Sequence, residues 1–286
     1  MSNLFNGLES MGLQGLENVK IYDDEPKKTD NKAEKTKTPE VTEADYLFDK
    51  TYKCPVCEKE FKAKMVRAGK TRLIGSDSDL RPKYSGIDSI KYDAIVCPYC
   101  GYASLSRFFG NLTDGQIKLI TGTVTANFKG MPEYGDIYTY DEAISRLKLV
   151  LLSTIVKKGK NSEKAYTCLK LAWVYRGLSE HLAETGELTE EKEKFCKNNE
   201  NEMLKNALEG FVAARQGENF PVCGMDECTL DYLIADIAVR TGRLDLAEQM
   251  ISNVIVSRNS NTRLKDKART LRDTIKAVSY THLRAH

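Results

Sequence analysis

The chain has 286 residues and a formal net charge of +2, and 29% of its residues are charged. This length suits two modest domains, and the near balance of charge excludes a bulk electrostatic attraction to nucleic acid or to an anionic membrane. No segment approaches the roughly 20 consecutive apolar residues of a membrane span, and the first residues lack the basic and apolar regions of a secretion signal. We therefore expect a cytoplasmic protein that does not act at a membrane.

Residues 1–45 are expected to form a disordered N-terminal head and linker. Residues 22–42 consist mainly of Asp, Glu, Lys and Thr, with Pro26 and Pro39 among them. Such a composition buries too little apolar surface to offset the entropy lost on ordering. The preceding head is richer in apolar residues and could order on a partner, but a loosely ordered terminus is the simpler expectation.

Residues 46–112 are predicted to form a small β-rich domain of the zinc-ribbon kind. Short runs of Tyr, Val, Ile and Phe, interrupted by Gly and Pro, indicate strands and turns. The segment contains two Cys-Pro-x-Cys motifs, and each such turn presents two thiolates to one point. The sequence therefore predicts one structural zinc ion held by Cys54, Cys57, Cys97 and Cys100. Iron suits the same thiolate set, and a redox-active cysteine pair is the less favoured alternative.

Two features depart from the commonest four-cysteine pattern. The segment between the pairs is longer than the usual 15 to 20 residues, so it must form a loop or hairpin of its own. Glu58 follows the first pair where glycine is common, and a left-handed backbone there is unfavourable for a residue with a side chain. Neither departure removes a ligand. Because four thiolates leave no coordination position for water, we expect the metal to support the fold and not to perform hydrolysis.

A basic strip lies between the two cysteine pairs, at residues 62–72, and this segment contains no acidic residue. Such a strip could follow the phosphates of a nucleic acid. A solvated strand face is the favoured interpretation, because the strip lacks aromatic residues on which bases would stack. The candidate nucleic-acid contacts are Lys62, Lys64, Arg67, Lys70 and Arg72.

Residues 113–277 are predicted to be helical. Thr113 suits the N-cap of a first helix, and apolar residues recur at helical spacing from there on. Residues 229–257 resemble a degenerate tetratricopeptide unit with Gly242 at its turn, and residues 165–216 resemble a second unit lengthened by a polar insertion over residues 187–201. A final helix with an apolar stripe closes the stack. We exclude residues 278–286 as a non-native tail, because they abandon this periodicity and resemble translated adapter sequence.

The predicted fold class is therefore α+β, mostly α, with a small four-cysteine ribbon followed by a tetratricopeptide-like antiparallel helical array. No common catalytic motif emerges from the sequence, so a non-enzymatic adaptor that binds a protein or peptide on the helical array is the favoured hypothesis. The alternatives are a nucleic-acid-binding regulator that uses the basic strip and, less favoured, a thiol redox enzyme that uses its cysteine pairs.

A further set of motifs runs in order through the N-terminal half: YKCPVC at 52–57, VR at 66–67, RL at 72–73, DSDLRP at 77–82, YD at 92–93 and VCPYCGYA at 96–103, with Phe61, Lys70 and Tyr84. In these motifs the chain resembles a bacterial family of unknown function, domain of unknown function 2225, found widely in Firmicutes. The resemblance implies a bacterial cytoplasmic protein with a cysteine-rich N-terminal part and a tetratricopeptide-like C-terminal part, and it implies no activity. It marks residues 77–82 as part of the shared pattern, and we expect these residues to form a loop packed beside the metal.

Overall fold

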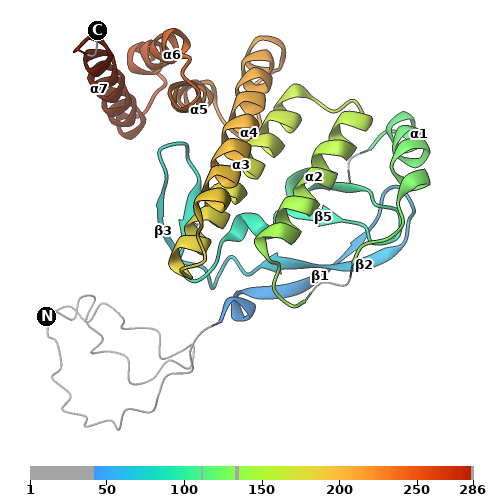
Figure 1. Cartoon of the computed structure of the whole chain (residues 1–286). Helices are drawn as coiled ribbons and strands as arrows, with labels where there is room; N and C mark the ends of the chain where they lie inside the picture. The colour runs from blue at the N-terminus through green and yellow to red at the C-terminus, as the bar shows by residue number, and fades with distance from the viewer. Residues whose placement is uncertain (1–41, 111, 133–134, 285–286) are drawn as a thin grey trace, which may run out of the picture. The chain divides into compact units, whose positions relative to one another are not determined.

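The computed structural model describes residues 42–110, 112–132 and 135–284, with side chains up to residue 276. The predicted head and linker lie outside the described residues as far as residue 41. No helix in the described part of the chain is long and apolar enough to cross a membrane. Residues 41–286 form one compact unit, in which small antiparallel sheets precede a packed array of helices (Figure 1). This arrangement confirms the predicted α+β, mostly α, fold class.

The N-terminal part contains three two-stranded antiparallel sheets, whose strands pair as β1 with β2, β3 with β4, and β5 with β6. In β2, Phe61 and Ala63 are buried while Lys62 between them is exposed, so one face packs on the core and the other meets solvent. The strands are β1 Leu47–Lys53, β2 Glu60–Val66, β3 Leu73–Ser76, β4 Pro82–Tyr84, β5 Ala94–Val96 and β6 Ala103–Leu105.

The helices α1, α2, α4 and α5 begin at residues whose side chains cap them. The side chain of Thr113 accepts a hydrogen bond from the backbone N–H of Gln116, and Thr139 does the same with Glu142, so each cap satisfies one of the N–H donors left free at the helix start. The predicted cap at Thr113 is confirmed. The helices are α1 Asp114–Thr123, α2 Tyr140–Val156, α3 Asn161–Glu184, α4 Glu190–Gly217, α5 Glu227–Arg240, α6 Leu244–Val256 and α7 Thr262–Arg284.

Consecutive helices pack against one another along the array (Figure 1). The predicted hairpin over residues 229–257 is confirmed as α5 and α6, and Gly242 in their turn has a positive φ of 79°. From residue 190, the polar residues 187–201 form the largely exposed first half of the long helix α4, in which Cys196 is buried. The backbone of α7 continues to Arg284, beyond residue 277, where the sequence places the end of the helical part.

The largest hydrophobic cluster joins the small sheets to the helices. Val96 of β5 and Leu105 of β6 belong to the same buried cluster as Leu147 of α2 and Leu169 of α3. A second, smaller cluster surrounds the cysteines. The boundary predicted at residue 112 stays a prediction, but apolar contacts cross it and fix the position of β5 and β6 against α2.

Candidate metal centre

The two cysteine motifs fold into turns of the same kind. In the first turn, the N–H of Glu58 donates to the carbonyl of Cys54 at 2.9 Å, and the N–H of Cys54 donates to the carbonyl of Lys59 at 3.0 Å. In the second, the N–H of Gly101 donates to the carbonyl of Cys97 at 3.0 Å, and the N–H of Cys97 donates to the carbonyl of Tyr102 at 2.9 Å. Each turn therefore closes with two backbone hydrogen bonds and leaves both of its thiols on one side.

The residue after each pair adopts the left-handed backbone conformation, with φ of 60° at Glu58 and 76° at Gly101. The turn requires this conformation, which explains why the sequence has glycine at one of the two positions. A Cβ atom at Gly101 would also lie 2.6 Å from the ring of Phe128, so the second turn has no room for a side chain. At Glu58 the first turn retains the unfavourable conformation that the sequence indicates.

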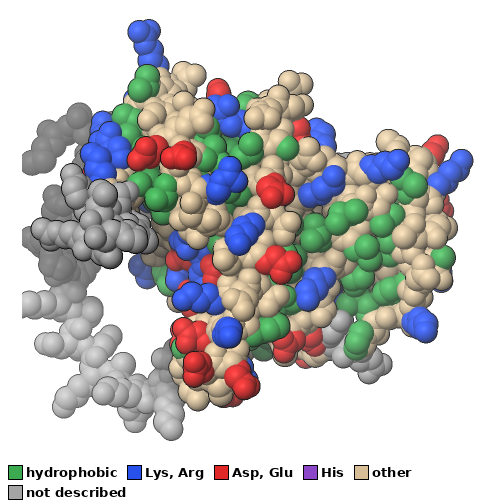
Figure 2. Space-filling view, turned by 45° about the horizontal axis from the view of Figure 1, so that its top comes forward, with side chains coloured by type: hydrophobic (Ala, Val, Ile, Leu, Met, Phe, Trp, Pro, Cys, Tyr) green, Lys and Arg blue, Asp and Glu red, His purple; other side chains and the backbone are tan. Residues whose placement is uncertain are grey.

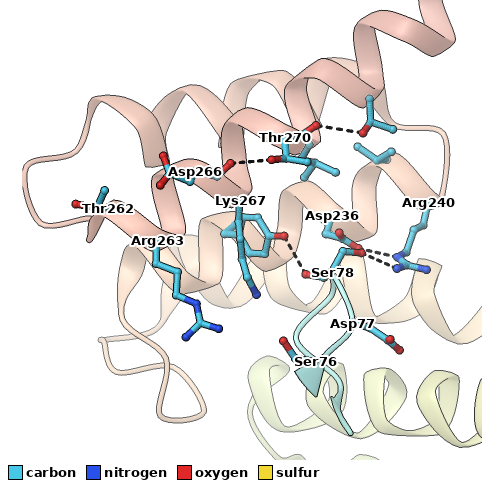
Figure 3. Close-up of a pocket in the computed structure, with 14 residues that line it drawn as sticks. Ser76, Asp77, Ser78, Asp236, Arg240, Thr262, Arg263, Asp266, Lys267 and Thr270 are labelled. Atoms are coloured by element: carbon cyan, nitrogen blue, oxygen red, sulfur yellow. Dashed lines mark hydrogen bonds and ion pairs between the residues drawn. The ribbon is translucent and has the colours of Figure 1, made fainter. Parts of the chain in front are cut away.

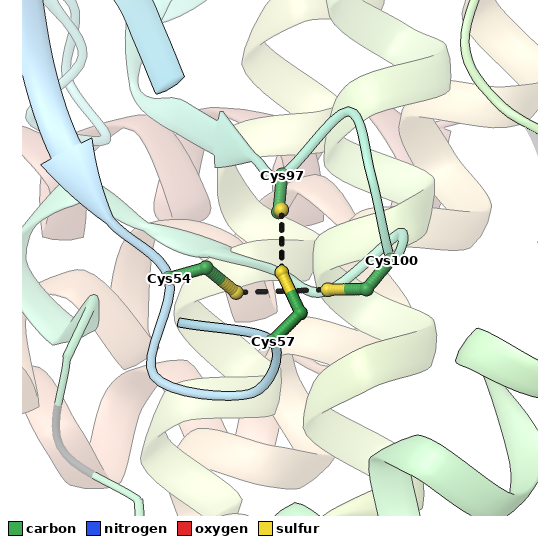
Figure 4. A group of neighbouring side chains, drawn as sticks. All are labelled: Cys54, Cys57, Cys97 and Cys100. Atoms are coloured by element: carbon green, nitrogen blue, oxygen red, sulfur yellow. Dashed lines mark hydrogen bonds between the residues drawn. The ribbon is translucent and has the colours of Figure 1, made fainter. Parts of the chain in front are cut away.

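The four thiols converge on one point (Figure 4). All four Sγ atoms lie within 4.8 Å of one another, and the pairs Cys54–Cys100 and Cys57–Cys97 are each separated by 3.6 Å. A tetrahedral ion with metal–sulfur bonds of about 2.3 Å places its sulfur ligands about 3.8 Å apart. A disulfide would require about 2.05 Å. The geometry therefore suits four ligands around one ion and excludes a disulfide in this arrangement.

The cysteine cluster is enclosed by apolar side chains. Cys54, Cys97 and Cys100 are almost fully buried, and Phe61 and Tyr102 belong to the same cluster. Their rings both contact that of Phe109, at centroid separations of 6.0 Å for Phe61 and 5.4 Å for Tyr102. An enclosed site of this kind limits access of water and of competing ligands to the sulfur atoms.

The thiols influence one another's ionisation. Hydrogen bonds from the thiols of Cys100 and Cys54 lower the pKa of Cys97 to about 2. Contacts with Cys54 and Cys97, followed by burial, raise the pKa of the Cys100 thiol. The thiolate of Cys97 therefore forms easily, while the thiols of Cys54 and Cys100 resist ionisation. A cation bound among the four sulfur atoms would offset the repulsion between thiolates, and the four residues could hold a metal ion.

The metal centre is tied directly to the helical array. The backbone N–H of Ala103, at the start of β6, donates to the hydroxyl of Ser153 in α2 at 3.2 Å, and both residues are buried. Ile120 of α1 packs in the same apolar cluster as the cysteines. The turn that carries Cys97 and Cys100 therefore has its position fixed by two helices.

The other four cysteines do not gather into a second site within the described residues, where Cys54, Cys57, Cys97 and Cys100 are the one candidate metal group. The thiol of Cys223 donates to the carbonyl of Ser162, and that of Cys228 contacts the hydroxyl of Ser257. They serve as small packing residues, as does the buried Cys168.

The basic strip is divided by its contacts. Lys64 pairs with Asp49 and with Asp136, each at 3.1 Å, and the Nε of Arg67 donates to the carbonyl of Leu47 at 2.8 Å. The acidic partners that the strip lacks in sequence are therefore supplied from β1 and from residue 136. Lys62, Lys70 and Arg72 remain exposed.

The expectation that residues 77–82 pack beside the metal is wrong. These residues form the end of the β3–β4 hairpin, which reaches the helices α3 and α5 (Figure 1). The side chain of Asp79 is fully buried, and its carboxylate accepts hydrogen bonds from the indole N–H of Trp173 at 3.0 Å and from Arg176 at 2.7 and 3.2 Å. The hydroxyl of Tyr232 donates to the carbonyl of Ser78 at 3.0 Å.

The buried Asp79 remains ionised because of these partners. Burial alone would raise the pKa of this carboxyl, but the hydrogen bonds and charge of Arg176 outweigh burial and lower it. Arg176 also contacts Asp77 at 3.0 Å and Glu200 at 2.7 Å. The loop is therefore held by an interlinked set of charge-assisted hydrogen bonds that the sequence reasoning missed. No local signal indicates it, because Asp79 and Arg176 are 97 residues apart.

The fold and the site together define a mostly helical protein with a closed four-cysteine centre at its β-rich end. The chain belongs to a family described as an uncharacterized protein conserved in bacteria (DUF2225), whose sequence profile matches residues 47–275. No curated protein and no solved structure matches the chain. The match covers both the cysteine motifs and the helical array.

Proposed function

We propose that the protein is a non-enzymatic adaptor: one structural zinc ion stabilises its N-terminal part, and the helical array binds another protein. The observation that carries the proposal is the closed arrangement of four thiols around one point, three of them buried and that of Cys57 partly buried. An ion bound there has all four tetrahedral positions filled by protein and none left for water or substrate. When bound, the ion supplies charge neutralisation and cross-linking of two turns.

The position of the centre supports a structural role. The two turns connect β1 to β2 and β5 to β6, and the β5–β6 sheet shares its core with the helices. Structural zinc contributes an apparent free energy of about 10–16 kcal/mol in small peptides, which is comparable with the whole stability of a domain. Holding the two sheets together at this point would fix the β-rich end of the array on which a partner binds.

The described surface favours protein recognition over nucleic acid. In the face drawn in Figure 2, blue and red side chains are scattered among each other and do not gather into one basic field. Within the basic strip, Lys64 is already neutralised by two carboxylates, and Arg67 is engaged with β1. Lys62, Lys70 and Arg72 give fewer phosphate contacts than specific nucleic-acid binders use.

Two measurements test the proposal. Protein purified without chelator should contain one zinc ion per chain by elemental analysis. Tagged holoprotein, incubated with extract of the bacterium that encodes it, should retain a protein partner at fixed stoichiometry, and hydrogen exchange of the complex should show protection on the helices. Cys100→Ser, which removes one ligand, serves as the matched control.

Other results would contradict the proposal. Absence of a stoichiometric ion, or retention of no partner above the Cys100→Ser control, would remove its basis. Retention that disappears on nuclease treatment and on replacement of Lys62 and Lys70 by glutamate would assign the protein to nucleic acid instead.

A further inference from the structure

A groove of about 840 Å³ lies between the tip of the β3–β4 hairpin and the helices α5 and α7 (Figure 3). Ser76 and Ser78 of the hairpin form one wall, and Thr270 and Leu271 of α7 contribute to the opposite wall. Val239 lies on the α5 side. A groove of this volume and mixed lining is large enough for a short peptide segment or a small molecule.

The neighbouring surface of α3 and α5 already accommodates an acidic segment of the chain itself. Ser78 and Asp79 lie there, with the carbonyl of Ser78 accepting from Tyr232 and its hydroxyl accepting from Arg240 at 2.8 Å. Tyr232 and Arg240 also line the open groove. The groove therefore continues a helical surface whose chemistry suits an irregular chain segment that carries carboxylates.

Three carboxylates and three cations line the groove, and each of these carboxylates is already engaged by a cation of the chain itself. Asp236 pairs with Arg240 at 2.6 Å, and Asp266 pairs with Arg269 at 2.7 Å. Asp77 is engaged by Arg176 outside the groove. No described carboxylate lies within ion-pair distance of the two remaining cations, Arg263 and Lys267, which extend from α7 into the groove (Figure 3).

We propose that this groove binds an extended acidic peptide segment of a partner protein. The carboxylates of the peptide meet Arg263 and Lys267. The apolar side chains of the peptide pack on Val239, Leu271 and the ring of Tyr232, and Lys267 lies over that ring at 5.9 Å from its centroid. The hairpin tip forms the side of the binding channel. This inference rests on the proposed adaptor function and specifies the chemistry of its partner.

The test uses the full-length holoprotein and two fluorescein-labelled decapeptides of equal leucine and serine content. One peptide carries four aspartates and the other carries four lysines. Fluorescence polarisation should show saturable binding of the aspartate peptide alone, weakening as salt is added because the ion pairs are partly exposed. The double variant Arg263→Glu, Lys267→Glu should weaken binding at least tenfold.

The matched control is the double variant Arg272→Glu, Lys276→Glu. It makes the same charge change on exposed positions of α7 that do not line the groove, so it should bind the aspartate peptide within about twofold of the parent. Thr270→Trp, which fills the groove without changing charge, should also abolish binding. Circular dichroism and zinc content verify that every variant remains folded.

Three outcomes would overturn the inference: equal binding of both peptides, no binding of either, or equal loss of binding in the two charge-reversed variants. A partner retained by the holoprotein after the groove variants have been made would preserve the adaptor function and place its binding surface elsewhere. Absence of any retained partner would instead end the adaptor proposal itself.

Discussion

Replacing Asp79 with alanine should lower the free energy of unfolding by about 3–5 kcal/mol, because the change breaks a buried, hydrogen-bonded ion pair. The carboxylate is fully buried and accepts three hydrogen bonds from Trp173 and Arg176. Its removal leaves the indole N–H without a partner, which alone costs about 1–3 kcal/mol. Arg176 keeps Asp77 and Glu200 as partners, which places the total near the lower end of the range.

The effect can be measured by urea unfolding followed through the fluorescence of Trp173, the one tryptophan in the chain, which lies at the perturbed site. For a unit of this size the melting temperature should fall by about 6–20 °C. Asp49→Ala is the control, because it removes a carboxylate whose side chain is 46% exposed in its pair with Lys64 and should cost less than about 1 kcal/mol. Trypsin should also cleave the Asp79 variant faster after Lys83. Equal stability of the two variants, with unchanged cleavage at Lys83, would refute the reasoning.

Three further predictions concern the metal centre, the two left-handed turns beside it and the charge of Asp79. Chelation of the metal, or Cys100→Ser, should abolish the one-to-one zinc content and unfold the β-rich end first, which hydrogen exchange would show. Protection of the β-rich end that persists without metal would contradict a structural role. Gly101→Ala should destabilise the protein by more than about 1 kcal/mol, since the new Cβ atom meets Phe128. Glu58→Gly should be neutral or stabilising by up to about 1 kcal/mol, because it relieves a left-handed backbone. A higher melting temperature for the Gly101 variant than for the Glu58 variant would disprove the assignment of both left-handed turns. Because the folded pKa of Asp79 is lowered, its stabilisation is present above the unfolded value of about 3.9 and is lost as pH falls through the folded pKa. The stability gap between the parent and Asp79→Asn should therefore close toward low pH, and a gap that widens on acidification would be inconsistent with an ionised Asp79.

The cysteine centre was predictable because its chemistry is local in sequence. Two residues between the cysteines of each pair suffice to direct both thiols to one side, and the fold brings all four sulfur atoms within 4.8 Å of one another. Helix starts were predictable for the same reason, since the N-cap at Thr113 bonds to a residue three positions along. The unfavourable backbone at Glu58 could also be foreseen by comparison with Gly101 in the second turn.

The position of the β3–β4 hairpin was not predictable, because its partners lie far away in sequence. Asp79 accepts a hydrogen bond from Arg176 on α3, and the hydroxyl of Ser78 accepts one from Arg240 on α5, 162 residues after Ser78. Nothing in the spacing of these polar residues marks them as a set. For the same reason the ion pair of Lys64 was not foreseen, because its partner Asp136 lies 72 residues away.

The contact between Ser78 and Arg240 has a consequence for how the protein is made. At a synthesis rate of about 5–20 residues per second, the segment between them takes about 8–30 s to emerge after the hairpin. During that interval the acidic tip of the hairpin lacks its last helical partner, while the second cysteine turn emerges soon after the hairpin and completes the set of four thiols. We therefore expect all four thiols of a newly made chain to be available to the proposed ion before the tip is fully secured, and a ribosome stalled ahead of α5 to display a hairpin held by α3 alone.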